Sequence, residues 1–181
     1  MFVQTEITPN PNSLKFIPGK AVSNDGSFEF TNKDDVENDL LRNLLSINGV
    51  TGIFLGSDFL SVNKEANIDW EDIKHIVISL INEFYSEGKE FIIDKTLEAK
   101  EKSEFLEIEN KIIKILESKI RPAVAKDGGD IKFKEYKDGV VKVQLQGSCS
   151  GCPSSTMTLK QGVQNLLCHY IPEVKEVIAI Q

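Results

Sequence analysis

Cys149 and Cys152 are the residues of this 181-residue chain whose type and spacing could do chemistry. A β-branched run at 140–145 predicts a strand before them, and an apolar pattern at 156–170 predicts a helix after them, so a turn presents both thiols. The partial positive charge at a helix N-terminus favours thiolate over thiol, and we therefore expect both cysteines to ionise readily. A thiolate is the form that binds a metal or attacks a disulfide.

These two cysteines supply only half of a usual metal site. Structural zinc ions and cubane iron–sulfur clusters normally take four protein ligands. Cys168 lies at the far end of the predicted helix, roughly 22 Å from the turn at about 1.5 Å of rise per residue, so it cannot join the site within one chain. We expect Cys168 to pack as a small hydrophobe and His169 to bind no metal. The missing ligands come from a second copy of the chain, another protein or a small thiol.

The cysteine spacing alone is compatible with three functions. The pair could carry a cluster, exchange thiol for disulfide as a redox enzyme does, or hold a structural zinc ion between two subunits. The Ser-Gly dipeptide between the cysteines, and a hairpin in place of a βαβ unit before them, argue against the thiol–disulfide oxidoreductase.

Composition limits the partners and the compartment. A formal net charge of -7 argues against a surface that binds nucleic acid or an anionic membrane. Three cysteines do not make a disulfide framework and fit a reducing compartment. No apolar run approaches the roughly 20 residues of a membrane span. The first residues lack the pattern of a secretory signal or an Arg-rich transit peptide, and we expect neither.

The first half of the chain alternates strand and helix patterns. Strands are predicted at 2–7, 13–17, 28–30, 50–55 and 59–63, and helices over 36–47 and 69–88. Asn32 or Asp34 is expected to cap the first of these helices and Asp69 the second. We find no catalytic constellation in this half, and predict that the protein is not an enzyme.

The second half follows a charged stretch, 94–104, that has too few apolar residues to face a core and is predicted to be a linker. A helix from residue 105, bent by Pro122, precedes strands at 131–136 and 140–145, the cysteine turn with its helix, and a last strand at 174–180. The predicted fold class is α+β. It has two small domains, 1–93 and 105–181, and the second is ordered helix-strand-strand-helix-strand.

Two motifs in the second half resemble a known family. Residues 120–131 read Ile-Arg-Pro-Ala-Val-Ala-Lys-Asp-Gly-Gly-Asp-Ile, and residues 145–160 read Leu-Gln-Gly-Ser-Cys-Ser-Gly-Cys-Pro-Ser-Ser-Thr-Met-Thr-Leu-Lys. Together they resemble the C-terminal NifU-like (Nfu-type) iron–sulfur domain, over essentially all of 105–181. Residues 9–16, Pro-Asn-Pro-Asn-Ser-Leu-Lys-Phe, and 54–59, Phe-Leu-Gly-Ser-Asp-Phe, resemble the N-terminal domain of the mitochondrial and α-proteobacterial branch of that family.

The resemblance implies a function and its partners. It implies a carrier that binds a 4Fe–4S cluster through Cys149 and Cys152, shared across a homodimer, and passes it to apo iron–sulfur client enzymes. Other expected partners are the upstream iron–sulfur assembly proteins, with neither nucleic acid nor membrane among them. The expected compartment is the bacterial cytoplasm, or the mitochondrial matrix for a processed eukaryotic chain. The N-terminal domain would recognise partners or tune delivery, the alternative being an appendage that only adds stability.

Overall fold

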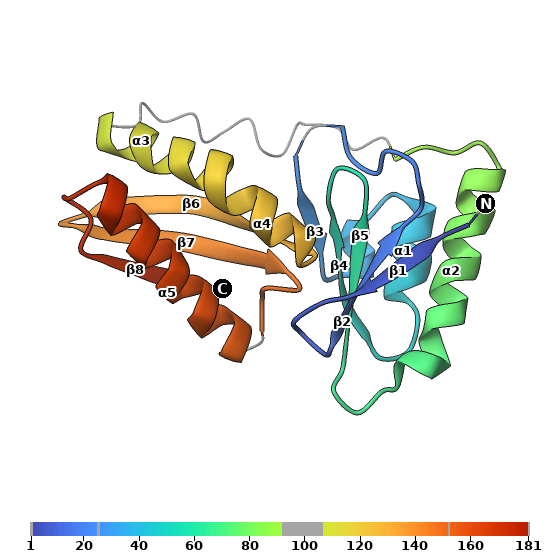
Figure 1. Cartoon of the computed structure of the whole chain (residues 1–181). Coiled ribbons are helices and arrows are strands. Elements are labelled where there is room, and N and C mark those ends of the chain that lie inside the picture. The colour runs from blue at the N-terminus through green and yellow to red at the C-terminus, as the bar shows by residue number, and fades with distance from the viewer. Residues whose placement is uncertain (1, 25, 92–106, 152, 181) are drawn as a thin grey trace. The chain divides into compact units, whose positions relative to one another are not determined.

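The structure is a computed structural model of the chain. It describes residues 2–24, 26–91, 107–151 and 153–180, the side chains of 153–155 excepted. The chain divides into two compact units, Met1–Ile93 and Asp94–Gln181, and each mixes helices with one sheet (Figure 1). The α+β fold class is therefore confirmed. The linker predicted at 94–104 lies outside the described residues.

The N-terminal unit is built on a five-stranded antiparallel sheet with the order β1-β2-β5-β4-β3. Its strands are β1 (Gln4–Ile7), β2 (Ser13–Ile17), β3 (Phe28–Phe30), β4 (Val50–Leu55) and β5 (Leu60–Lys64). Its helices are the 3-10 turn η1 (Lys33–Asp35), α1 (Asp39–Leu45) and α2 (Trp70–Ser86). Alternate residues of the central strands and the apolar faces of α1 and α2 share one core, as the period-2 and period-3.6 patterns require.

The C-terminal unit has the predicted order of elements. Its first helical segment comprises α3 (Glu107–Ile115), the π-helical turn η3 (Leu116–Ile120) and α4 (Arg121–Lys126). Strands β6 (Gly129–Lys137) and β7 (Val140–Gly147) form the hairpin, α5 (Pro153–Tyr170) follows the cysteine turn, and β8 (Glu176–Ile180) pairs parallel to β7. One face of this sheet and the apolar sides of both helical segments form a single core, which holds Ile112, Leu116, Val143 and Leu167 among others.

Pro122 is accommodated by a change of helix type. A proline inside an α-helix removes one N–H donor, and its ring crowds the carbonyl four residues earlier. The chain widens into the π turn immediately before it, where the Arg121 N–H donates to the Leu116 carbonyl five residues back. Pro122 then occupies the first turn of α4, where its missing N–H costs nothing. The expected bend is thus a π turn, which places Arg121 beside β6.

We predict that the two units are separable. Trypsin should cut first at Lys95, Lys100 or Lys102, because that charged stretch has too few apolar residues to pack against a core. A fragment that begins at Ser103 should keep a cooperative urea unfolding transition, since the core of its sheet is closed within it. Mass spectrometry of the first fragments and circular dichroism of the expressed fragment check both statements. A first cut inside α2 or the β6–β7 hairpin, or an unfolded fragment, would contradict them.

Candidate metal centre

The cysteine turn connects the end of β7 to the start of α5. Gly147 and Gly151 both take positive φ, +67° and +75°, a region that suits glycine and lets the chain reverse within a few residues. Cys149 lies between them, and its side chain is 6% exposed. Cys152 lies outside the described residues, so the structure places one of the two predicted ligands and leaves the other untested.

Cys149 packs under the turn against the backbone of Gly129. A Cβ atom added at Gly129 would lie 2.7 Å from the Cys149 Sγ and 2.6 Å from the carbonyl oxygen of Gln146. Real Cβ contacts are not this short, and the Gln146 carbonyl belongs to the paired strand and cannot move aside cheaply. Glycine at position 129 is therefore required for the thiol to occupy this place.

Hydrogen bonds hold the cysteine turn to the turn at 127–128. The Ser148 hydroxyl donates to the Asp127 carbonyl, and the Ser148 N–H donates to the Gly128 carbonyl at 3.2 Å. On the other side of the thiol, the Thr156 hydroxyl donates to the Cys149 carbonyl at 3.3 Å. In the sequence, residues 127–130 stand out only as part of the family motif at 120–131. The structure makes them the support on which Cys149 rests.

An ion pair fixes the start of β6 beside this support. The Arg121 guanidinium donates from Nε to Oδ1 of Asp130 and from Nη2 to Oδ2, both at 2.8 Å. The Ile131 N–H also donates to Oδ1 at 2.8 Å. Because the Asp130 side chain is buried, loss of the guanidinium would leave its charge without this partner inside the protein. Arg121 and Asp130 thus position Gly129, and through it the thiol.

The prediction that Cys149 ionises readily is wrong for this conformation. Burial raises the pKa of the Cys149 thiol to about 11. The hydrogen bond with Ser148 lowers this pKa, and the Asp127 and Asp130 carboxylates raise it again. The helix N-terminus is visible in the sequence and favours the thiolate, but the thiol points into the core, where the charged form is disfavoured.

Cys168 and His169 lie where the distance argument expects them, at the last turn of α5. Cys168 is half-buried and packs against the core, as a small hydrophobic residue does. The exposed His169 ring contacts Tyr170 edge to face, with the centroids 5.1 Å apart. Within the described residues, no group of three or more His, Cys, Asp or Glu side chains could hold a metal ion.

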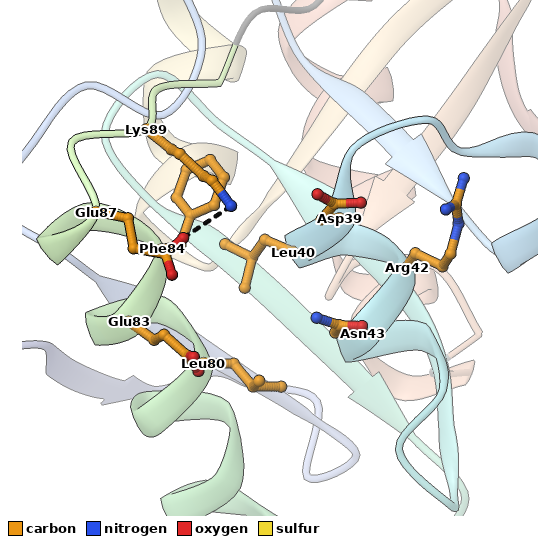
Figure 2. A pocket seen from close by; sticks show the side chains of 9 residues that line it. All are labelled: Asp39, Leu40, Arg42, Asn43, Leu80, Glu83, Phe84, Glu87 and Lys89. Carbon is orange, nitrogen blue, oxygen red and sulfur yellow. Dashed lines mark ion pairs between the residues drawn. The ribbon is translucent and has the colours of Figure 1, made fainter.

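The N-terminal unit has a hollow of about 280 Å³ between α1 and α2 (Figure 2). Leu40 and Phe84 are buried at its apolar floor, with Leu80 half-buried beside them. On its rim, Lys89 pairs with Glu87 at 2.7 Å, and the other charged or polar residues are Asp39, Arg42, Asn43 and Glu83. None of the residues that line the hollow is a cysteine or histidine.

Known families cover both units. The family model described as "NifU-like domain" matches residues 112–178, which include both cysteines of the turn. The model described as "Scaffold protein Nfu/NifU N terminal" matches residues 3–88. These matches define a two-domain protein with an Nfu-type N-terminal unit and a NifU-like C-terminal unit.

Relatives that match nearly the whole chain belong to the same family. The chain is 44% identical over 180 residues to "NFU1 iron-sulfur cluster scaffold homolog, mitochondrial" of Homo sapiens, covering 98% of this chain and 71% of that protein. It is 41% identical to "NifU-like protein 4, mitochondrial" of Arabidopsis thaliana, covering 98% of this chain and 65% of the relative. The chain belongs to the NifU-like (Nfu-type) protein family. It spans about two thirds of the length of these relatives.

Solved structures cover parts of the chain. A solution structure of a NifU-like protein from Saccharomyces cerevisiae shares 27% identity with a TM-score of 0.48, covering 52% of this chain and 87% of that one. A crystal structure of a Staphylococcus aureus protein shares 30% identity with a TM-score of 0.41, covering 44% of this chain and 98% of that one.

The raised pKa of Cys149 predicts a pH dependence of stability. The folded protein keeps this proton up to about pH 11, whereas the unfolded chain releases it near the ordinary pKa of 9.0. The folded state then binds more protons between these values, so the free energy of unfolding falls as pH rises, by at most about 1.4 kcal/mol per pH unit. The stabilisation is fully present below the unfolded-state pKa.

Urea unfolding at several pH values checks this prediction. Cys149→Ala is the matched control, because it lacks the buried thiol and keeps every other side chain of the parent protein. The difference in free energy of unfolding between the two proteins should shrink between about pH 9 and pH 11, the pKa values of this thiol in the unfolded and folded states. An equal loss of stability with pH in both proteins would contradict the burial of this thiol.

Proposed function

We propose that this protein is a carrier or scaffold for a 4Fe–4S cluster, which it accepts on the thiolates of Cys149 and Cys152 and passes to apo client proteins. The observation that carries the proposal is the turn between β7 and α5, which contains Cys149 of a Cys-x-x-Cys pair in a chain of the NifU-like family. Relatives of the chain are named iron–sulfur cluster scaffold proteins, which supports the same role.

Two chains share one cluster in this proposal. Each chain offers two thiols at the turn, and a cubane cluster takes four protein ligands. Cys168 packs at the other end of α5 and offers nothing to the site. A homodimer with the two turns face to face completes the ligand set, and the cluster is its bridge.

Cys149 must leave its buried place before it binds iron. The thiol releases its proton on binding, since iron takes the thiolate. That step needs the turn to open, which breaks the contact with Gly129 and the Ser148 hydrogen bond to the Asp127 carbonyl. The free energy of re-closing the turn then favours release of the cluster to a client with better-placed thiolates. A site of this kind binds the cluster and can still release it.

The geometry weighs against the oxidoreductase alternative. The attacking thiol of a thiol–disulfide oxidoreductase has a lowered pKa, whereas burial raises the pKa of Cys149 to about 11. The motif also follows the β6–β7 hairpin, and thioredoxin-like motifs stand next to a βαβ unit. A structural zinc ion would use the same two cysteines as ligands. Visible absorption distinguishes it from an iron–sulfur cluster, because zinc sites do not absorb visible light.

For the N-terminal unit we propose partner recognition, with upstream assembly proteins or apo clients as the partners. Its support is the hollow between α1 and α2 (Figure 2), which has an apolar floor and a charged rim. Protein-recognition surfaces commonly combine an apolar centre with a polar edge.

Cysteine substitutions test the ligand assignment. Cys149→Ala and Cys152→Ala should each abolish stable cluster binding, because one lost thiolate per chain leaves two of the four ligands in the dimer. Cys168→Ala should retain the cluster and change only stability, by about 1 kcal/mol or less. Visible absorption and iron content after anaerobic reconstitution with iron and sulfide are the measurements. Loss of the cluster in Cys168→Ala together with its retention in Cys149→Ala would overturn the assignment.

A further inference from the structure

The exposed face of α5 carries almost no charge. Val163 and Leu167 face the core, and the opposite side exposes Thr158, Gln161, Gly162, Asn165 and His169. The helix contains no acidic residue, and its one lysine, Lys160, lies 3.9 Å from Glu176 of β8, away from this face. None of these five positions carries a formal charge, although 27% of the chain's residues are charged. We refer to these five residues as the α5 face.

Gly162 lies in the middle of the α5 face, and neither packing nor backbone conformation within its own unit requires a glycine there. It is exposed, a Cβ atom added there would meet nothing within 4 Å, and its φ is not positive. A glycine in a helix interior costs about 1 kcal/mol relative to alanine. Neither turn geometry nor packing within the unit offsets that cost. What a glycine does provide is room for another backbone to come close.

Met157 flanks the α5 face at the end near the cysteine turn. Its side chain is 74% exposed and lies five residues after Cys152 in the sequence. Methionine is enriched at protein interfaces and depleted at ordinary surfaces, while interface centres are depleted in charged residues. Met157 and the uncharged α5 face have both properties, and they adjoin the proposed metal centre.

We propose that the α5 face is the surface on which a second copy of this chain docks, with the two α5 helices side by side in parallel and closest at Gly162. The inference rests on the proposed function, since the ligand set at the turn is incomplete without a second chain. In a two-fold symmetric pair each face meets its own copy. A face without charge can do so without repulsion.

The position of Gly162 suits this arrangement. It lies nine residues after the start of α5, or about 14 Å along the axis. Two helices that touch there at crossing angles of about 20° to 40° separate by only about 5–9 Å more at their starts. Both cysteine turns then lie at the same end of the pair, side by side. An antiparallel pairing would put them at opposite ends.

The α2 and α3 surfaces suit a self-pairing contact less well than the α5 face. The α3 surface presents Glu107, Glu109, Lys111 and Lys114 within one short helix, and the first turn of α2 carries Glu71 and Asp72. Two copies that met through the first turn of α2 would place carboxylates opposite each other, and a contact through α3 would have to match its mixed charges sign to sign. This comparison favours the second copy on α5.

A charge-swap experiment at the closest point tests the inference. Gly162→Glu and Gly162→Lys each place like charges face to face in the pair, and each should lower the dimer fraction of the cluster-loaded protein at least tenfold. An equal mixture of the two variants places opposite charges together and should restore the dimer. Ser118→Glu is the control, because Ser118 is exposed in η3, is not one of the residues of the α5 face, and gains the same charge in this variant. The readout is sedimentation velocity after anaerobic reconstitution with iron and sulfide, with circular dichroism to confirm folding.

The outcomes separate the docking surface from the function. Dimers of Gly162→Glu at the level of the parent protein would overturn the α5 surface and leave the cluster-carrier proposal standing. Folded variants that stay monomeric both alone and mixed would also overturn it, since repulsion would not be the cause. Failure of the unsubstituted protein to take up iron would instead overturn the proposed function.

Discussion

The contact between the Cys149 thiol and the Gly129 backbone is the constraint on which the candidate centre depends. It joins two turns that are twenty residues apart, and it exists only because β6 and β7 pair with Gly129 opposite Gly147. The Arg121–Asp130 ion pair fixes one side of this contact and the Ser148 hydrogen bonds fix the other. The π turn before Pro122 is part of the same construction, because it carries Arg121 to the strand.

These contacts explain how a small unit can protect a thiol by burial and still make it available when the turn opens. A thiol inside the core is protonated and shielded, so it neither oxidises nor captures stray metal easily. The interactions that keep it there are a few hydrogen bonds, each worth about 1 kcal/mol, and the packing of the thiol in the core. Binding of the proposed cluster by two chains offsets the free energy of opening the turn. A single metal ion bound by one chain would make fewer bonds to thiolates and would offset less of it. The same balance makes the proposed cargo removable.

The sequence predicts the order of elements in both units because period-2 and period-3.6 patterns report local burial directly. The helix starts depend on single side chains and are less predictable. Asn38, whose side chain accepts from the Leu41 N–H at 3.2 Å, caps α1, while the expected Asn32 caps the separate 3-10 turn η1. Asp69 occupies the N-cap position of α2 but makes no side-chain hydrogen bond there.

The burial of Cys149 could not be predicted from local sequence. The helix N-terminus is a local feature, but the core that receives the thiol is assembled from β6, β7 and the two helical segments. The role of residues 127–130 is hidden for the same reason, since their contact with the cysteine turn is tertiary. The uncharged α5 face is visible in the sequence as a helix without acidic residues, but only exposure shows that this face is outside the core.

Native mass spectrometry of the anaerobically reconstituted protein tests the central claim most directly, because it weighs the chains and the cluster together. The account predicts one species with two chains, four irons and four sulfides, which returns to single chains when a chelator removes the iron. A single chain that carries a complete cluster with no small thiol or second protein bound would contradict it.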